Sequence, residues 1–195
     1  MRTIIATKIL ALALVAQAFT ATGDHPHETR EPVAVGQEIS VFGGDREQVE
    51  LVRWASQRFE RAGLELPDVA VYFHRDTAGC YGFQGYELDG RVDVCMIHVS
   101  ELARRIVLHE LGHRWIDENV SESVRDRFLE QRNLRAWSET DVRWDARGSE
   151  HGAEIIAWAL GTRHETPTIP DRDPARLAAG FELLTGARFP PPSDV

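Results

Sequence analysis

A five-residue motif in the middle of the chain has the spacing of a metal site. His109 and His113 lie four residues apart and enclose Glu110, in the pattern H-E-x-x-H. On an α-helix, residues four apart lie about 40° apart around the axis, so both imidazoles point to the same side. Two such imidazoles can bind one zinc ion, and the glutamate beside them can act as a general base. The motif therefore predicts two metal ligands and one catalytic residue.

The residues before the motif predict that it lies on an amphipathic helix over about residues 101–118. Ser100 is suited to cap the N-terminus of this helix. Apolar residues lead up to the two histidines at helical spacing, so the histidines continue an apolar stripe. The stripe consists of Leu102, Ile106, His109 and His113. The alternative at this point is a pair of core histidines that bind no metal.

A metal site in an enzyme needs a third protein ligand and one open position. A third histidine six residues after the second is excluded, because Asn119 stands there. On a later predicted helix, residues 149–161, Glu150 and Glu154 head a face that is otherwise mostly small and apolar. Buried carboxylates need a cation or a hydrogen-bond donor, and a metal ion on the motif helix would supply the cation. Alternatively, both glutamates only complement the dipole of a helix N-terminus.

The N-terminus predicts export. Arg2 and Lys8 form a positively charged start before an apolar run over residues 9–16, and a small-x-small cleavage pattern follows it. We therefore expect residues 1–18 to be a signal peptide. An uncleaved anchor is the alternative, although the run is short for a bilayer span. The expected localisation is therefore secreted or extracytoplasmic. Lys8 is the only lysine of the chain, which suggests a GC-rich bacterial genome.

The rest of the chain has the composition of one globular domain. We expect residues 19–44 to form a flexible lead-in and residues 45–190 a single domain. The formal net charge is −9 at pH 7, which disfavours binding to nucleic acid or to an anionic membrane surface. No stretch after the signal peptide predicts a membrane span. The oligomeric state is not predicted.

The periodicity of apolar residues predicts an α+β domain. The expected strands cover residues 38–42, 67–74, 80–87 and 91–97, the last of which leads directly into the motif helix. Besides the helices already named, we expect a helix over residues 45–63, with Asp45 as its N-cap. Further helices are expected over residues 121–131 and from Asp173 to Gly186.

The two cysteines, Cys80 and Cys95, are suited to a disulfide in an exported protein, with two buried free thiols as the alternative. A bridge would stabilise the fold by about 3 kcal/mol in the chain-entropy model. However, a tight turn at Asp89-Gly90 pairs Gln84 with Cys95 and leaves Cys80 too far away. A disulfide therefore requires an irregular ribbon, and we expect a distorted loop in place of a clean hairpin.

The two motifs together, H-E-L-G-H at 109–113 and E-x-x-A-E at 150–154, resemble the gluzincin branch of the zinc metalloproteases over roughly residues 100–160. The resemblance implies a zincin-like fold: a small mixed or antiparallel sheet packed on the HExxH helix, with a C-terminal helical part. It implies that Glu150 is the third zinc ligand and that Glu154 orients a ligand histidine. The tryptophan-rich run before Glu150 is also similar to a group of uncharacterised actinobacterial exported proteins.

The resemblance implies a secreted zinc-dependent peptidase in which Glu110 is the general base for a zinc-activated water. Its partner would be a peptide or protein substrate, held by pairing to the strand over 91–97 beside the active helix. Gluzincins usually offer a histidine or tyrosine that stabilises the oxyanion, and here the choice stays open. The candidates after the motif helix are His151, His164, Arg143 and Arg147. The alternatives are a non-catalytic zinc-containing binding protein and an amide hydrolase that acts on cell-wall peptides.

Overall fold

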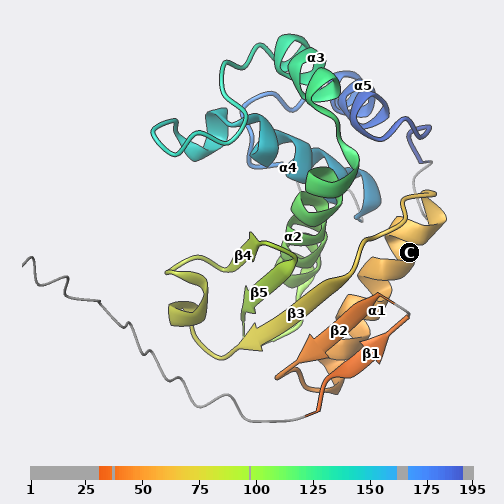
Figure 1. The fold of residues 1–195 in the computed structure, drawn as a ribbon, viewed down its shortest axis with the longest axis vertical. Coiled ribbons are helices and arrows are strands. Elements are labelled where there is room, and N and C mark those ends of the chain that lie inside the picture. The colour runs from red at the N-terminus through yellow and green to blue at the C-terminus, as the bar shows by residue number, and fades with distance from the viewer. Residues whose placement is uncertain (1–30, 37, 97, 162–166, 191–195) are drawn as a thin grey trace, which may run out of the picture.

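The computed structural model of the chain describes residues 31–36, 38–96, 98–161 and 167–190. These residues form a mixed α+β fold, as predicted, with one mixed sheet and a separate helical layer (Figure 1). The expected signal peptide, residues 1–18, lies outside the described residues. Within the described ranges, no helix is both long and apolar enough to cross a membrane.

The sheet of the described residues has five strands in the order β1-β2-β3-β5-β4. The strands are β1 (Val33–Val35), β2 (Ile39–Phe42), β3 (Val69–His74), β4 (Gly85–Leu88) and β5 (Arg91–Cys95). The neighbours β2, β3 and β5 run parallel, while the two edge strands, β1 and β4, run antiparallel to the strands beside them.

The first two strands belong to the range that was expected to be a flexible lead-in. Val35, Ile39 and Val41 are each no more than 3% exposed and lie in the hydrophobic core. The ordered domain therefore starts before residue 45, and the prediction of a lead-in is wrong for its described part. Strand β2 agrees with the strand expected over residues 38–42, whereas β1 was not predicted, because three residues are too few to show an alternation.

The helices are α1 (Arg46–Arg61), α2 (Glu101–Asn119), α3 (Glu122–Arg132), α4 (Gly148–Leu160) and α5 (Pro174–Thr185). The N-termini of α1, α2 and α5 follow from local chemistry, whereas α3 and α4 have no side-chain cap. Asp45 caps α1 in a reciprocal capping box with Gln48, and the Ser100 hydroxyl accepts from the third backbone amide of α2. Asp173 caps α5, which ends at Gly186 in the left-handed conformation. Such caps depend on neighbouring residues, which is why they were predicted correctly.

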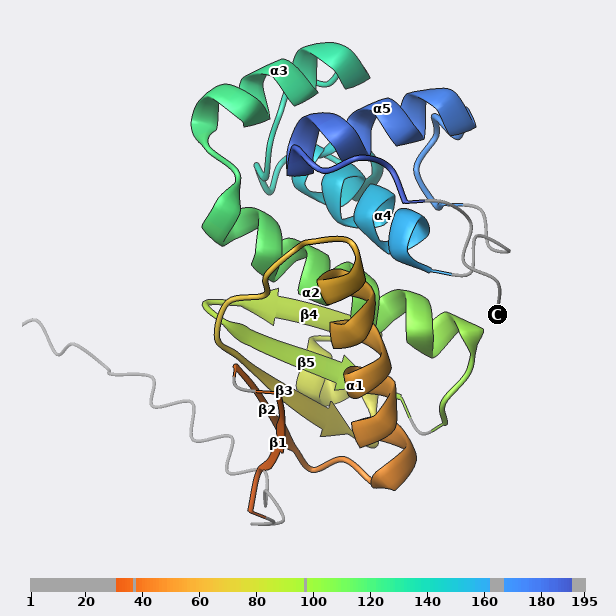
Figure 2. The same ribbon diagram turned by 90° about the vertical axis from the view of Figure 1, so that its right-hand side faces the viewer.

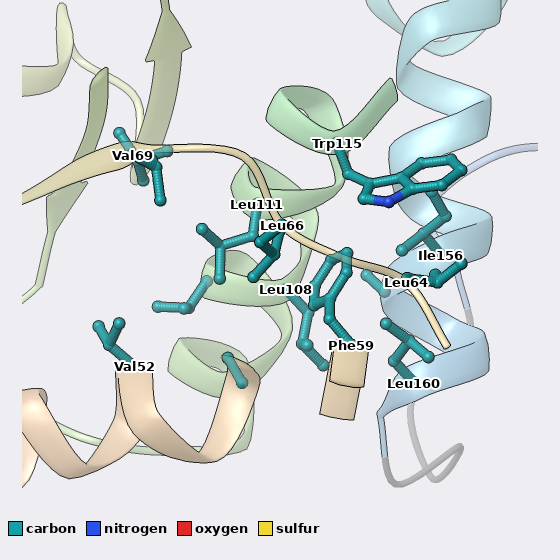
Figure 3. Packing of buried hydrophobic residues seen from close by; sticks show 14 of the residues in the cluster. Val52, Phe59, Leu64, Leu66, Val69, Leu108, Leu111, Trp115, Ile156 and Leu160 are labelled. Carbon is teal, nitrogen blue, oxygen red and sulfur yellow. The ribbon is translucent and has the colours of Figure 1, made fainter. Parts of the chain in front are cut away.

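Helix α2 lies between the sheet and the layer that α3, α4 and α5 form (Figures 1 and 2). Buried residues of α1 and α2 pack against the sheet, and the opposite side of α2 packs against α4 (Figure 3). Phe59 and Leu108 are fully buried in this core, and Ile156 is a fully buried residue of α4. The helix that carries the HExxH motif is thus fixed from two sides.

The hairpin of β4 and β5 has the register that the Asp89-Gly90 turn predicts. Leu88 is opposite Arg91, and the Cys95 amide donates to the Gln84 carbonyl over 2.8 Å. The ladder between these ends is regular, so the prediction of a distorted hairpin is wrong.

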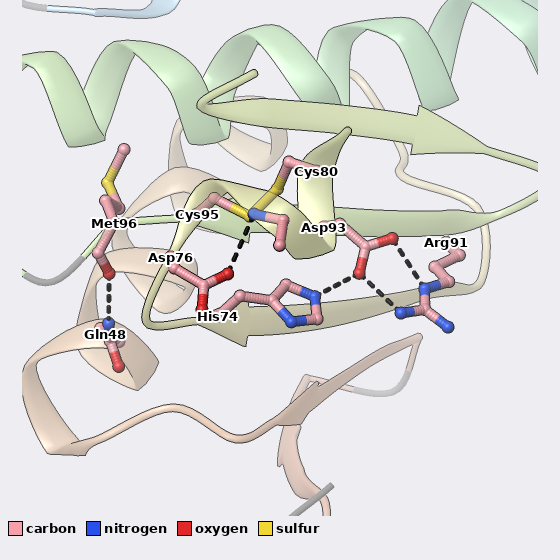
Figure 4. Close-up of a disulfide and its surroundings, with 9 residues drawn as sticks. Gln48, His74, Asp76, Cys80, Arg91, Asp93, Cys95 and Met96 are labelled. Carbon is pink, nitrogen blue, oxygen red and sulfur yellow. Dashed lines mark hydrogen bonds and ion pairs between the residues drawn. A yellow bond between two sulfur atoms is a disulfide. The ribbon is translucent and has the colours of Figure 1, made fainter. Parts of the chain in front are cut away.

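Cys80 and Cys95 nevertheless form a disulfide, with Cα atoms 6.1 Å apart (Figure 4). Cys80 does not lie on the strand expected over 80–87, because it ends a short 3-10 helix over Thr77–Cys80. Tyr81 and Gly82 then adopt positive φ angles of 53° and 90°, which reverse the chain before β4. Because the irregular residues precede the hairpin, the ladder between β4 and β5 stays regular although Cys80 is bonded to Cys95.

Candidate metal centre

Helix α2 and helix α4 approach each other closely, and this approach brings the two motifs together. A Cβ atom built on Gly112 would lie only 3.3 Å from the Cα atom of Ala153. Small residues at this crossing allow the two backbones to pack without an intervening side chain. Glu150 lies in the first turn of α4, one turn before Ala153, so its carboxylate reaches the histidines of α2.

Three side-chain atoms converge at this crossing. His109 Nε2 and His113 Nε2 lie 3.1 Å apart, and each lies 3.2 Å from Glu150 Oε2. Two nitrogen ligands and one oxygen ligand about 2.0–2.1 Å from a tetrahedral ion would be separated by roughly 3.3 Å. The observed spacing is close to this value. The triad His109, His113 and Glu150 could therefore hold a metal ion, as the sequence predicts.

The triad is largely shielded from water, and Glu150 is held in its charged form. Burial alone would raise the pKa of Glu150, but hydrogen bonds from the His109 and His113 rings outweigh it and keep this pKa well below the usual range. A carboxylate that stays ionised is the form that binds a cation. The charge and the donor atoms of the triad both fit a divalent metal ion.

Glu154 lies behind His109, where the sequence predicts an orienting acceptor. Its Oε1 atom is 3.7 Å from His109 Nδ1, which is too long for a hydrogen bond. The same carboxylate is 2% exposed and accepts hydrogen bonds from Arg105 and from the Thr168 hydroxyl. His109 Nδ1 is buried and has no hydrogen-bond partner among the described residues. Glu154 is thus placed beside this nitrogen but does not bond to it here.

Glu110 lies beside the triad and is almost completely buried. It is 7% exposed, and burial raises its pKa from 4.5 to about 7, although the neighbouring His113 charge partly opposes this. A carboxyl group with a pKa near neutrality can both accept and release a proton at pH 7. This is the property required of the general base that the motif predicts.

Strand β4 passes directly over Glu110, which sequence analysis did not predict. A Cβ atom on Gly85 would overlap the Glu110 carboxylate and the Ile106 side chain. Only glycine leaves room for this close approach. The signal in the sequence was a glycine at the start of a strand, but its partner on α2 lies 25 positions later and could not be recognised.

The strand beside the active helix is also different from the one expected. Strand β5 pairs with β3 on one side and with β4 on the other. Its backbone therefore cannot pair with a substrate, and the expectation for residues 91–97 is wrong. Strand β4 is the edge strand on this side, and its outer edge pairs with no other strand of the described residues.

Three of the four candidates for oxyanion stabilisation are engaged elsewhere. The buried His151 ring donates from Nε2 to the Asp145 carbonyl over 3.0 Å, and Arg147 donates to the carbonyls of two loop residues. Arg143 pairs with Asp145 on the surface. The fourth candidate, His164, lies outside the described residues.

Trp144 lies against the triad and was not predicted as a site residue. Its indole stacks on the His109 imidazole, with ring centroids 6.1 Å apart and an angle of 23° between the planes. The tryptophan-rich run before Glu150 was the signal in the sequence. It did not show which of its tryptophans would face the metal ligands.

Comparison with known proteins does not identify a family for the chain. No protein-family model matches the chain, and neither a curated protein nor a solved structure matches it. The residues of the site and their geometry are therefore the basis for assigning its chemistry.

Proposed function

We propose that the chain is a secreted zinc-dependent peptidase that hydrolyses peptide bonds with Glu110 as general base. The observation that carries this proposal is the convergence of the His109, His113 and Glu150 ligand atoms within 3.2 Å of one another, directly beside a buried carboxyl group. A ligand set of three residues with an adjacent base is typical of catalytic zinc sites.

Zinc fits the donor atoms better than other common cations. Two imidazole nitrogens and one carboxylate oxygen suit zinc, whereas magnesium and calcium prefer oxygen ligands throughout. The buried His109 Nδ1 supports metal binding at Nε2, without distinguishing between metals that imidazole binds. If Nε2 is a metal ligand, the ring hydrogen must be on Nδ1, where it would point toward the Glu154 carboxylate 3.7 Å away.

Glu110 would carry out the proton transfers of the reaction. When bound, zinc would lower the pKa of water toward neutrality and polarise the substrate carbonyl. Glu110 would accept the proton of the attacking water and pass it to the leaving amine. A pKa of about 7, raised by burial, suits a group that must do both in one cycle.

Strand β4 supports a peptide as the substrate. Its outer edge is free of strand partners among the described residues, and its first residue, Gly85, lies against Glu110. A peptide added to this edge would make backbone hydrogen bonds and would pass close to the base. The disulfide between Cys80 and Cys95 is the kind of bond that persists outside the cytoplasm and supports export.

The test combines metal analysis with a peptidase assay on the purified chain. We expect one zinc ion per chain and hydrolysis of an unstructured protein substrate, which is lost with a chelator and restored by zinc. Glu110→Gln should keep zinc and lose at least about 10²-fold in kcat. Glu118→Gln, at an exposed position of α2, is the matched control. Full activity of Glu110→Gln would refute the mechanism.

A non-catalytic zinc-containing binding protein is the second candidate. It is favoured by one observation, namely that His151, Arg143 and Arg147 are all bound to other groups. Stoichiometric zinc without hydrolysis of any peptide or protein would support this candidate. Chelator-sensitive hydrolysis of peptide bonds would exclude it.

A further inference from the structure

Trp144 exposes apolar surface directly beside the metal-ligand set. Its ring stacks on His109, yet 39% of the residue remains exposed. Exposure of a single apolar side chain needs no explanation by itself, but binding sites are typically lined by aromatic and apolar side chains beside a few polar groups, and Trp144 has this position next to the triad. Trp144 therefore has an unfilled contact surface at the place where the proposed reaction occurs.

The loop that carries Trp144 is irregular but well anchored. Trp144–Ala146 is a single 3-10 turn. The Arg147 guanidinium, which follows it, donates to the carbonyl of Val142 over 2.8 Å and to that of Thr140 over 3.1 Å. Hydrogen bonds on the C-terminal side of the turn thus close the loop on itself.

His151 fixes the same turn from the side of α4. The residue is 3% exposed and so lies inside the protein. Its Nε2 atom donates to the carbonyl of Asp145, the residue directly after Trp144. A buried imidazole is costly unless it is hydrogen-bonded, and this one stabilises the backbone position that sets the indole against His109.

The contact surface that the Trp144 indole offers is apolar. The nearest carboxylate in sequence, Asp145, is already paired with Arg143 at 2.6 Å. A basic peptide side chain would therefore find no unpaired carboxylate on this turn. An aromatic or large aliphatic side chain could instead cover the exposed part of the indole and exclude water from it.

We infer that Trp144 is a specificity-determining residue that contacts the substrate and selects an aromatic or large aliphatic side chain next to the bond cleaved. The inference rests on the proposed peptidase function. Its alternative is that the indole only packs His109 into place. The two roles differ in effect, because a packing role changes zinc affinity and a contact role changes the choice of peptide.

The experiment compares Trp144→Ala and Trp144→Phe in the zinc-loaded full chain. The substrates are peptides that differ only beside the scissile bond, where they carry Phe, Leu, Ser or Lys. The wild type should prefer Phe and Leu over Ser and Lys by at least about tenfold in kcat/KM. Trp144→Ala should reduce this preference to about twofold, while Trp144→Phe keeps most of it. Val33→Ala removes an exposed apolar side chain on β1, at the opposite edge of the sheet from β4, and should change nothing.

A binding measurement gives a second readout without turnover. In the Glu110→Gln background, fluorescence anisotropy of the same labelled peptides should show the same preference, which the added Trp144→Ala removes. An unchanged preference in Trp144→Ala, or a loss of zinc affinity with the preference intact, would overturn the inference alone. A wild type that hydrolyses none of the peptides would overturn the proposed function together with the inference.

Discussion

Gly112 on α2 lies against Ala153 on α4, so closely that a Cβ atom on Gly112 would be 3.3 Å from the Ala153 Cα atom. This contact sets the distance between the helix that carries the two histidines and the helix that carries Glu150. Glycine lowers the intrinsic stability of a helix by roughly 1 kcal/mol relative to alanine. At this position the close approach of α4 offsets that cost.

Gly112→Val should weaken the metal site by separating the two helices. The added side chain overpacks the crossing, which costs roughly 1–3 kcal/mol of stability, and moves Glu150 away from the histidines. Zinc affinity should fall at least about tenfold, as measured by competition with a chromophoric chelator. Glu118→Val places the same β-branched residue at an exposed position of α2 and should leave zinc affinity unchanged. Equal affinities of the two variants would show that the crossing does not determine the site.

Gly85→Ala should reduce turnover while the metal remains bound. The new methyl group would overlap the Glu110 carboxylate, whereas the ligand atoms of the triad are not touched. We expect unchanged zinc stoichiometry and a loss of at least about tenfold in kcat, because a displaced base transfers protons poorly. Leu88→Ala, in an exposed position of the same strand, is the control. A Gly85→Ala variant as active as the control would show that Glu110 need not stay where β4 holds it.

Glu154→Gln should lower zinc affinity without removing the site. The carboxylate lies 3.7 Å from His109 Nδ1, and its charge favours a ring hydrogen on that nitrogen. Loss of an acceptor behind a ligand histidine typically costs 10- to 100-fold in metal affinity. Glu150→Gln removes a charged ligand and should lower affinity further. Identical zinc affinities of Glu154→Gln and wild type would show that Glu154 serves only as a hydrogen-bond acceptor for Arg105 and Thr168.

The pH dependence of stability should reveal the buried Glu110 in the metal-free protein. Its pKa is raised from 4.5 to about 7 by burial. Below pH 4.5 the group is neutral in both the folded and the unfolded chain. Between pH 4.5 and 7 only the unfolded chain releases the proton, so stability falls by roughly 3 kcal/mol and is then constant. The pKa of Glu150 is lowered in the folded protein, so ionised Glu150 stabilises the fold at neutral pH. This stabilisation is lost as the pH falls below 4.5.

Glu110→Gln removes this titration and should therefore stabilise the metal-free protein in a pH-dependent way. Urea unfolding of metal-stripped protein should show a gain of roughly 2–3 kcal/mol at pH 8 and of less than about 1 kcal/mol at pH 5. A gain of the same size at both pH values would mean that Glu110 is not held in its neutral form.

The sequence was most informative where structure depends on neighbouring residues. The caps at Asp45, Ser100 and Asp173 were predicted because they need only the first turn of their helix. The triad was predicted because its members come from two short motifs with helical spacing. The register of the hairpin was predicted from the Asp89-Gly90 turn alone.

Features that depend on distant contacts were missed. The disulfide between Cys80 and Cys95 was predicted, but its path through a 3-10 turn and a left-handed Tyr81 was not, because no periodicity marks such a reversal. Gly85 and Trp144 acquire their roles only through Glu110 and His109 on another element. The place of β4 at the edge of the sheet is likewise set by strand order, which local patterns do not determine.

The most direct test of the metal centre is a crystal structure of the zinc-loaded chain with anomalous data collected at the zinc edge. We predict one strong anomalous peak within about 2.0–2.2 Å of His109 Nε2, His113 Nε2 and a Glu150 carboxylate oxygen. An absence of zinc between these three side chains, or zinc bound only elsewhere in the chain, would contradict the proposed centre.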